Sequence, residues 1–301
     1  MPQTLPNPRA QVHADFSVAA SRDQLGAPAV LRLWHLASLD APTVAAVWTL
    51  AFAWAAHVRL PPWIPLLLAL AAWSVYIADR LLDARSAIRA NNLTILRDRH
   101  RFHHLHRRFL LPITVAAALA AVWIVFTQMP IAARERNSAL AVAALAYFTR
   151  VHSPGRLPSF GISRLLKKEL LVGLLFTAAC ALPAISRASS PETKLPLLPA
   201  ALFFAVLAWL NCHAIEAWES SETSPYTPQI QTQAALLAIG GMALALLLAP
   251  AHSRAAALVL CGVGSALLLA LLDRFRGNIT PLALRAAADL VLLTPLALLF
   301  A

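Results

Sequence analysis

The sequence predicts an all-α, polytopic membrane protein, a bundle of about nine transmembrane helices. Of its 301 residues, 59% are hydrophobic and only 13% are charged, whereas about one-quarter are charged in a typical soluble domain. Apolar runs recur along the chain, and a membrane-spanning helix needs about 20 such residues at a rise of 1.5 Å each. Lys and Arg concentrate in every second connection, as expected for loops that stay in the cytoplasm.

The polar, proline-containing residues 1–35 show no signal-peptide pattern, so we expect a cytosolic tail there and a transmembrane domain over 36–301. Nine apolar runs follow, each bounded by proline, arginine or polar clusters. The fourth run has the shortest apolar core. The predicted spans are Leu39–His57, Pro62–Ala78, Phe109–Gln128, Ser138–Phe148, Leu165–Ile185, Leu195–Ile215, Gln233–Pro250, Ala255–Leu272 and Pro281–Phe300.

The distribution of positive charge predicts the orientation of these spans. With the amino terminus in the cytoplasm, 19 of the 25 Lys and Arg residues lie on the inner face, in agreement with the excess of positive charge in cytoplasmic loops. The carboxyl terminus then lies on the opposite side. The net charge of +11 follows one membrane face, so we expect membrane lipids and phosphorylated lipids as partners and no nucleic acid.

Asp79 and Asp83 end the second apolar run and are spaced i, i+4, which places both carboxylates on one helix face. Like charges at this spacing repel each other unless a cation lies between them. Mg²⁺ suits such a pair, because it takes a few carboxylate oxygens and completes its shell with water and phosphate oxygens. The alternative is that both aspartates pair with Arg80, Arg85 or another arginine of the following loop.

The segment Val75–Asp83 resembles the first aspartate-rich motif of the UbiA-type intramembrane prenyltransferases, Asn-Asp-x-x-Asp-x-x-x-Asp. Asp79 and Asp83 match its last two aspartates, while Val75 and Tyr76 replace its asparagine and its first aspartate. The resemblance covers nearly the whole chain. It implies a UbiA-like bundle of nine helices, with an inside amino terminus and an active site that opens to the cytosol.

Two further segments on the inner face resemble that family. Residues 146–150 are similar to its tyrosine-containing loop, and residues 166–173 are similar to its basic entry into the fifth helix. The resemblance implies that Tyr147, Arg150, Lys167 and Lys168 bind the substrate diphosphate, for which a lysine ammonium is a suitable point charge. Alternatively, the two lysines are anchors that extend toward the headgroups from a helix end.

The third segment, Asn211–Glu219, takes the place of the family's second aspartate-rich motif, with Asn211, Glu216 and Glu219 in place of aspartates. The resemblance implies that Asp79, Asp83, Glu216 and Glu219 are catalytic and that Asn211 helps bind the diphosphate. The implied Mg²⁺ ligands are Asp79, Asp83 and Glu216. Alternatively, His213 and Glu216 could bind a transition metal.

Three other features lie outside these motifs. Residues 81–108 form a basic, His- and Arg-rich cytosolic loop, whose arginines favour an anion over a metal. It is interpreted as an interfacial helix over a phosphorylated lipid, or as a headgroup-binding anchor. Arg285 and Asp289, spaced i, i+4, are expected to neutralise each other. Asp40 is expected to line the cavity or to cap the first transmembrane helix.

The function predicted from these residues is Mg²⁺-dependent transfer of an isoprenoid chain from a prenyl diphosphate lipid to an acceptor that the sequence does not identify. Trp73, Tyr76, Trp209 and Trp218 are candidate walls of the reaction cavity, because aromatic faces attract cations. The alternative is a catalytically altered or non-catalytic protein on the same scaffold that binds or transports lipids or small molecules. A metal- or haem-related membrane protein is a further alternative, based on His213 and the loop histidines.

Overall fold

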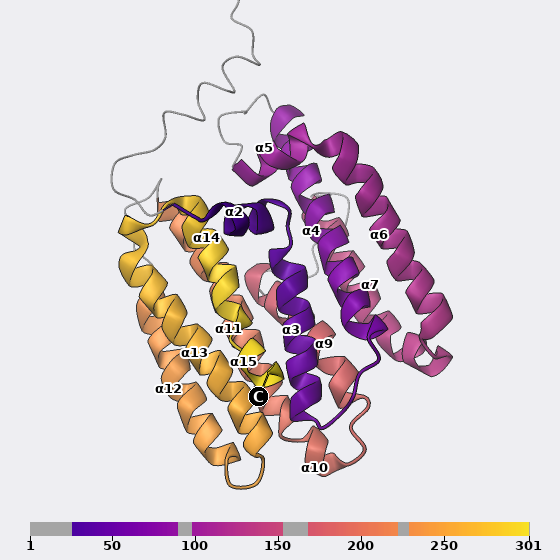
Figure 1. Ribbon diagram of the computed structural model, residues 1–301, viewed down its shortest axis with the longest axis vertical. Coiled ribbons are helices and arrows are strands. Elements are labelled where there is room, and N and C mark those ends of the chain that lie inside the picture. Colours follow the sequence, from indigo (N-terminus) through magenta and orange to yellow (C-terminus); the bar gives the residue numbers. More distant parts are fainter. Residues whose placement is uncertain (1–25, 90–97, 153–167, 222–228, 301) are drawn as a thin grey trace, which may run out of the picture.

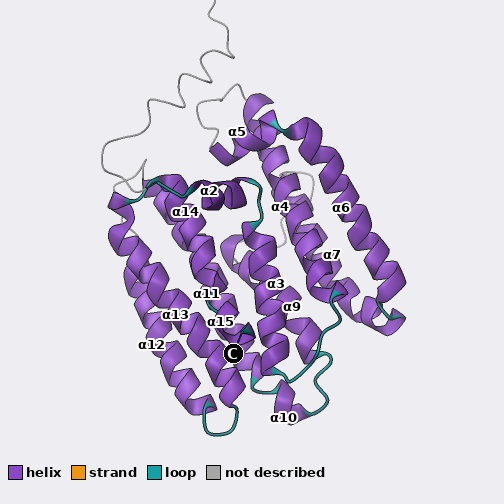
Figure 2. Cartoon of the chain, in the orientation of Figure 1, coloured by secondary structure: helices purple, strands orange, loops and turns teal. Residues whose placement is uncertain are grey.

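A computed structural model describes residues 26–89, 98–152, 168–221 and 229–300, and every regular element in these ranges is a helix (Figure 2). The helices are α2 (Ala29–Leu36), α3 (Asp40–Ala55), α4 (Trp63–Arg89), α5 (Asp98–Leu105), α6 (Arg107–Gln128), α7 (Ile131–His152), α9 (Lys168–Ile185), α10 (Pro191–Lys194), α11 (Leu197–Ser221), α12 (Ile230–Leu248), α13 (Ser253–Phe275), η2 (Arg276–Asn278), α14 (Pro281–Leu290), η3 (Val291–Leu293) and α15 (Leu296–Leu299).

Several of these helices are long and apolar enough to make this a multi-pass membrane protein. In the described ranges six stretches meet that condition: Trp63–Arg85, Arg107–Gln128, Pro191–Glu219, Ile230–Leu248, Ser253–Asn278 and Pro281–Leu299. A seventh span is present if α2 and α3, which meet at an angle of 89°, are counted as one.

The prediction of nine spans is therefore met only in part. Each of the nine apolar runs contributes residues to a described helix, but the apolar part of α9, Glu169–Ile185, is short for a span. The first turns of α7 carry Arg134, Glu135 and Arg136, which dilute its apolar character. An all-helical membrane bundle is what the structure supports.

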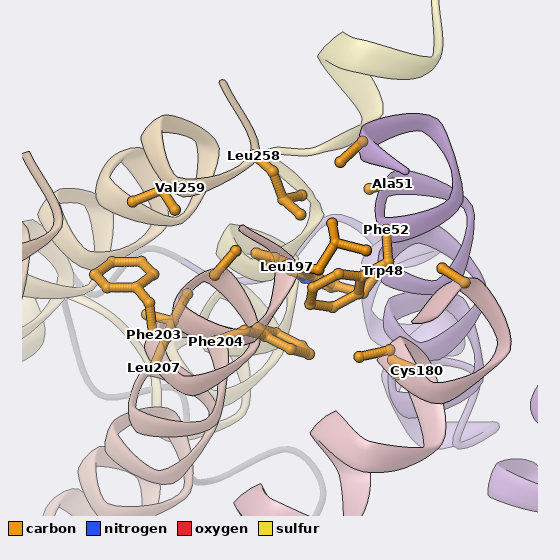
Figure 3. Packing of buried hydrophobic residues seen from close by; sticks show 14 of the residues in the cluster. Trp48, Ala51, Phe52, Cys180, Leu197, Phe203, Phe204, Leu207, Leu258 and Val259 are labelled. Carbon is orange, nitrogen blue, oxygen red and sulfur yellow. The ribbon is translucent and has the colours of Figure 1, made fainter. Parts of the chain in front are cut away.

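The long helices lie side by side, with α12 and α13 on one flank, α6 and α7 on the other, and α3, α9 and α11 between them (Figure 1). Trp48 and Phe52 of α3 pack against Phe204 of α11 in the core (Figure 3). The Trp48 and Phe204 rings are stacked with their centroids 3.7 Å apart. The Trp48 indole N–H donates to the carbonyl of Leu292, at 2.8 Å, which connects the first long helix to the last segment of the chain.

The end of the bundle that carries the predicted site differs from the prediction in two ways. The expected tail, residues 1–35, includes most of α2, which lies across this end of the bundle (Figure 1). The expected loop, residues 81–108, is helical at both ends, because α4 continues to Arg89 and α5 begins at Asp98. Asp79 and Asp83 therefore lie within a helix rather than where it ends.

Candidate functional site

Asp79 and Asp83 lie one turn apart on α4, where the cationic helix α5 packs against it. The Asp83 side chain is 48% exposed, and its Oδ2 lies 3.8 Å from His100 Nε2 of α5. The Arg80 guanidinium contacts the α2–α3 connection. It donates to Ser38 Oγ and to the His35 carbonyl, and it lies 3.4 Å from Asp40 Oδ2. Arg80 thus ties α4 to the α2–α3 connection.

The predicted second acidic pair lies near the end of α11. Glu216 is exposed, whereas the Glu219 carboxylate accepts a hydrogen bond from Arg285 of α14. The predicted pairing of Arg285 with Asp289 is therefore wrong for Arg285. Although the two residues share a face of α14, the facing carboxylate of Glu219 on α11 takes the guanidinium.

Asn211, a predicted diphosphate ligand, is buried and donates through Nδ2 to Asp289 Oδ1, at 3.4 Å. Its amide is thus directed to α14. Tyr147 belongs to α7, which packs against α9, and α9 also contacts α4, the helix that carries Asp79. Lys167 lies outside the described residues, as do the side chains of Arg150 and Lys168.

The four aromatic residues expected in a cavity wall have different surroundings. The Trp73 indole donates to the carbonyl of Ala37, at 2.9 Å, and the Trp218 indole donates to Asp273, at 2.7 Å. Both N–H groups thus tie helices together. Trp209 stacks on His213 of the next turn, and the Tyr76 ring faces the Arg80 guanidinium at 5.9 Å.

A buried polar cluster that the motifs did not identify lies where α2, α3 and α14 meet. His35 Nδ1 is 2.8 Å from Asp40 Oδ2 and 3.7 Å from Asp289 Oδ2. The His35 and Asp40 side chains are each 2% exposed. The sequence singled out Asp40 and Asp289 as charges within predicted spans. It did not single out His35, because no local spacing relates His35 to Asp289.

The helix α5 joins this cluster to the basic surface, since His103 Nε2 lies 3.1 Å from Ser38 Oγ. A surface hollow of about 300 Å³ lies beside α5, lined by His104, Leu105, Arg107 and Arg108. Partial burial, and next the charge of Arg107, lower the pKa of His104 below its ordinary value. The positive charge of this hollow therefore comes from its arginines.

Comparison of the chain with protein-family models, with curated proteins and with solved structures finds no match.

Proposed function

We propose that the protein is an intramembrane prenyltransferase that moves an isoprenoid chain from a prenyl diphosphate to an acceptor, on a nine-helix scaffold like that of the UbiA-type enzymes. The proposal rests on the pair Asp79 and Asp83, one turn apart on α4, with His100 of the cationic helix α5 lying 3.8 Å from Asp83. Acidic and basic groups that face one another suit a ligand that combines a metal cation with an anionic diphosphate.

The donor types fit Mg²⁺, because Asp79, Asp83 and Glu216 all offer the hard oxygen ligands that this ion prefers. In the described structure their oxygens do not all lie within 4.8 Å of one another, so binding would have to draw α4 and the end of α11 together. We assign the metal to these three residues. Glu219 is already paired with Arg285, so its role is to hold α11 against α14. Mg²⁺, when bound, supplies positive charge that offsets the negative charge of the diphosphate.

Two groups of basic residues are assigned to stabilising the diphosphate and to attracting the lipid. Charge builds up on the diphosphate as its bond to the prenyl chain stretches, so cations that are already in place stabilise the transition state more than the ground state. Lys167, Lys168 and Arg150 are assigned to this task by sequence position. The arginines of α5 attract the phosphorylated lipid to this face of the bundle.

The test is a binding and turnover assay on the protein in lipid nanodiscs with prenyl diphosphates of several lengths, with and without Mg²⁺. We expect Asp79→Asn and Asp83→Asn to lower Mg²⁺-dependent binding and diphosphate release about 100-fold, the size of effect seen when one charge-stabilising group is removed from an active site.

The matched control is Glu192→Gln, which removes an exposed carboxylate from α10 at the other end of the bundle and should leave both quantities unchanged (Figure 1). A folded double variant of Asp79 and Asp83 that keeps Mg²⁺-dependent diphosphate binding would refute the assignment.

A binding or transport protein on the same scaffold is the second candidate. It is favoured by the cluster of ionisable groups formed by His35, Asp40 and the partly buried Asp289, since such groups at membrane depth often mark ion or substrate pathways. The same assay separates the two functions. Tight Mg²⁺-dependent binding of prenyl diphosphates without release of diphosphate, in the presence of membrane extracts as a source of acceptors, would favour binding or transport.

A further inference from the structure

We propose that His35, Asp40 and Asp289 form a binding site for a divalent transition-metal ion such as Zn²⁺ or Mn²⁺, separate from the residues assigned to Mg²⁺. One nitrogen and two carboxylate oxygens of these residues lie within 4.8 Å of one another. In the described part of the chain no other group of three or more His, Cys, Asp or Glu residues has this arrangement. His35 and Asp40 flank the short connection between α2 and α3, and tertiary packing of α14 brings Asp289 to them.

The contact between His35 and Asp40 is the first argument for a cation. His35 Nδ1 is buried and lies 2.8 Å from Asp40 Oδ2, but this short contact does not have the angle of a regular hydrogen bond. An N–H donor must point nearly along the line to its acceptor. Two neighbouring ligands of one metal have a different geometry. With metal–ligand distances of about 2.1 Å they lie about 3.0–3.4 Å apart, and the second ligand is about 35–45° off the lone-pair axis of the first. Such an offset leaves a short contact that is not a hydrogen bond.

The orientation of the two carboxylates is the second argument. Asp40 Oδ1 accepts the N–H of Ala41, at 2.9 Å, and Asp289 Oδ1 accepts the Asn211 amide, at 3.4 Å. Each carboxylate therefore has its Oδ1 held by a separate donor and turns its Oδ2 toward His35, while Asp40 Oδ2 also lies 3.4 Å from the Arg80 guanidinium. Hydrogen bonds that orient the ligands in this way are typical of metal sites.

Charge balance is the third argument. With Arg80 3.4 Å from Asp40 Oδ2, two ionised carboxylates and a neutral His35 would leave one negative charge, which either a proton or a metal cation can offset. Burying an uncompensated charge is costly. A cation coordinated by His35 Nδ1 removes this negative charge and uses the unpartnered nitrogen in the same step.

The donor types select the metal class. An imidazole nitrogen with two carboxylate oxygens suits Zn²⁺, Mn²⁺ and related ions, whereas Mg²⁺ prefers oxygen ligands alone. Three protein ligands leave a coordination position open for water or a small ligand. A metal here would also fasten α2, which meets α3 at 89°, to the last long segment of the chain.

The test uses the full-length protein in detergent micelles, stripped with a chelator and titrated with Co²⁺ alone, because bound Co²⁺ has a visible spectrum that reports its ligands. We expect one Co²⁺ per chain, displaced by Zn²⁺. His35→Gln and Asp289→Asn should each weaken Co²⁺ binding about 10-fold to 100-fold. His104→Gln removes a surface histidine of α5 and is the matched control, with no change expected.

A further variant gives a positive signal: His35→Cys should add a thiolate-to-cobalt absorption band that the wild type lacks. Wild-type protein that binds no more Co²⁺ than His35→Gln, or a His104→Gln variant that loses as much, would overturn the proposal and favour a proton on His35 or surface chelation. Asp79→Asn should keep the Co²⁺ spectrum, which separates this result from the fate of the prenyl-transfer proposal.

Discussion

Trp48 connects three parts of the bundle at the scale of a single side chain. Its ring stacks on Phe204 of α11, and its N–H donates to the carbonyl of Leu292. Truncation to alanine leaves a cavity and an unpaired carbonyl, so we expect Trp48→Ala to lower the free energy of unfolding by about 3–5 kcal/mol. Thermal unfolding of the purified protein in micelles measures this loss.

Trp123 of α6 provides the matched control, because its side chain is 70% exposed on the lipid-facing flank. Trp123→Ala should change the free energy of unfolding by less than about 0.5 kcal/mol. Equal losses for the two alanine variants would contradict the role assigned to the Trp48 stack.

Single residues also show where sequence reasoning ends. Spacing correctly placed Asp79 and Asp83 on the same helix, because a helical repeat is a local property. The partner of Arg285 could not be predicted in the same way, since its choice of Glu219 over Asp289 depends on where α11 passes α14. The His35 cluster was missed for that reason too.

At the scale of elements, α9 and α11 approach each other closely at Gly173. A Cβ added there would lie 2.9 Å from both the Ala205 oxygen and the Trp209 nitrogen, and small residues are what allow helix backbones to meet in membranes. We expect Gly173→Ala to force these helices apart and to cost about 1–3 kcal/mol, measured as a lower unfolding temperature.

Gly240→Ala in α12 is the control that shows whether any glycine-to-alanine change lowers the unfolding temperature. A Cβ there meets nothing within 4 Å, so Gly240→Ala should keep or slightly raise the unfolding temperature, because alanine favours the helix by about 1 kcal/mol. A Gly173→Ala variant as stable as Gly240→Ala would count against close packing of α9 on α11.

Hydropathy predicted the positions of the long helices well, since the apolar runs contribute to α3, α4, α6, α7, α9 and the helices from α11 onward. It did not predict α2 as a separate helix or the extension of α4 to Arg89. Both are polar or short, and both lie where contacts with other helices decide the structure: α2 packs against α5 and α14, and α4 against α5.

For the whole molecule, the positive-inside distribution predicts that α5 faces the cytosol and α10 the opposite side. These two helices lie at opposite ends of the bundle (Figure 1). We expect a membrane-impermeant maleimide added to intact cells to label Glu192→Cys but not Arg108→Cys, in a background where Cys212 and Cys261 are serine.

Permeabilised cells provide the control for this experiment, because both cysteines should then react: Glu192 and Arg108 are both exposed. Labelling of Arg108→Cys in intact cells, with Glu192→Cys protected, would reverse the orientation and place the acidic residues of α4 on the outer face.

The contact between Trp48 and Leu292 also has a consequence for synthesis. The core around α3 needs η3, and α15 packs against α3 as well. Residues near 48 leave the ribosome long before residues near 292, so the first long helix must wait in the lipid for its last neighbour. α4 and α9 pack against other faces of α3 and are made earlier, so only the face of α3 that contacts η3 and α15 stays uncovered until the final helical segment is released.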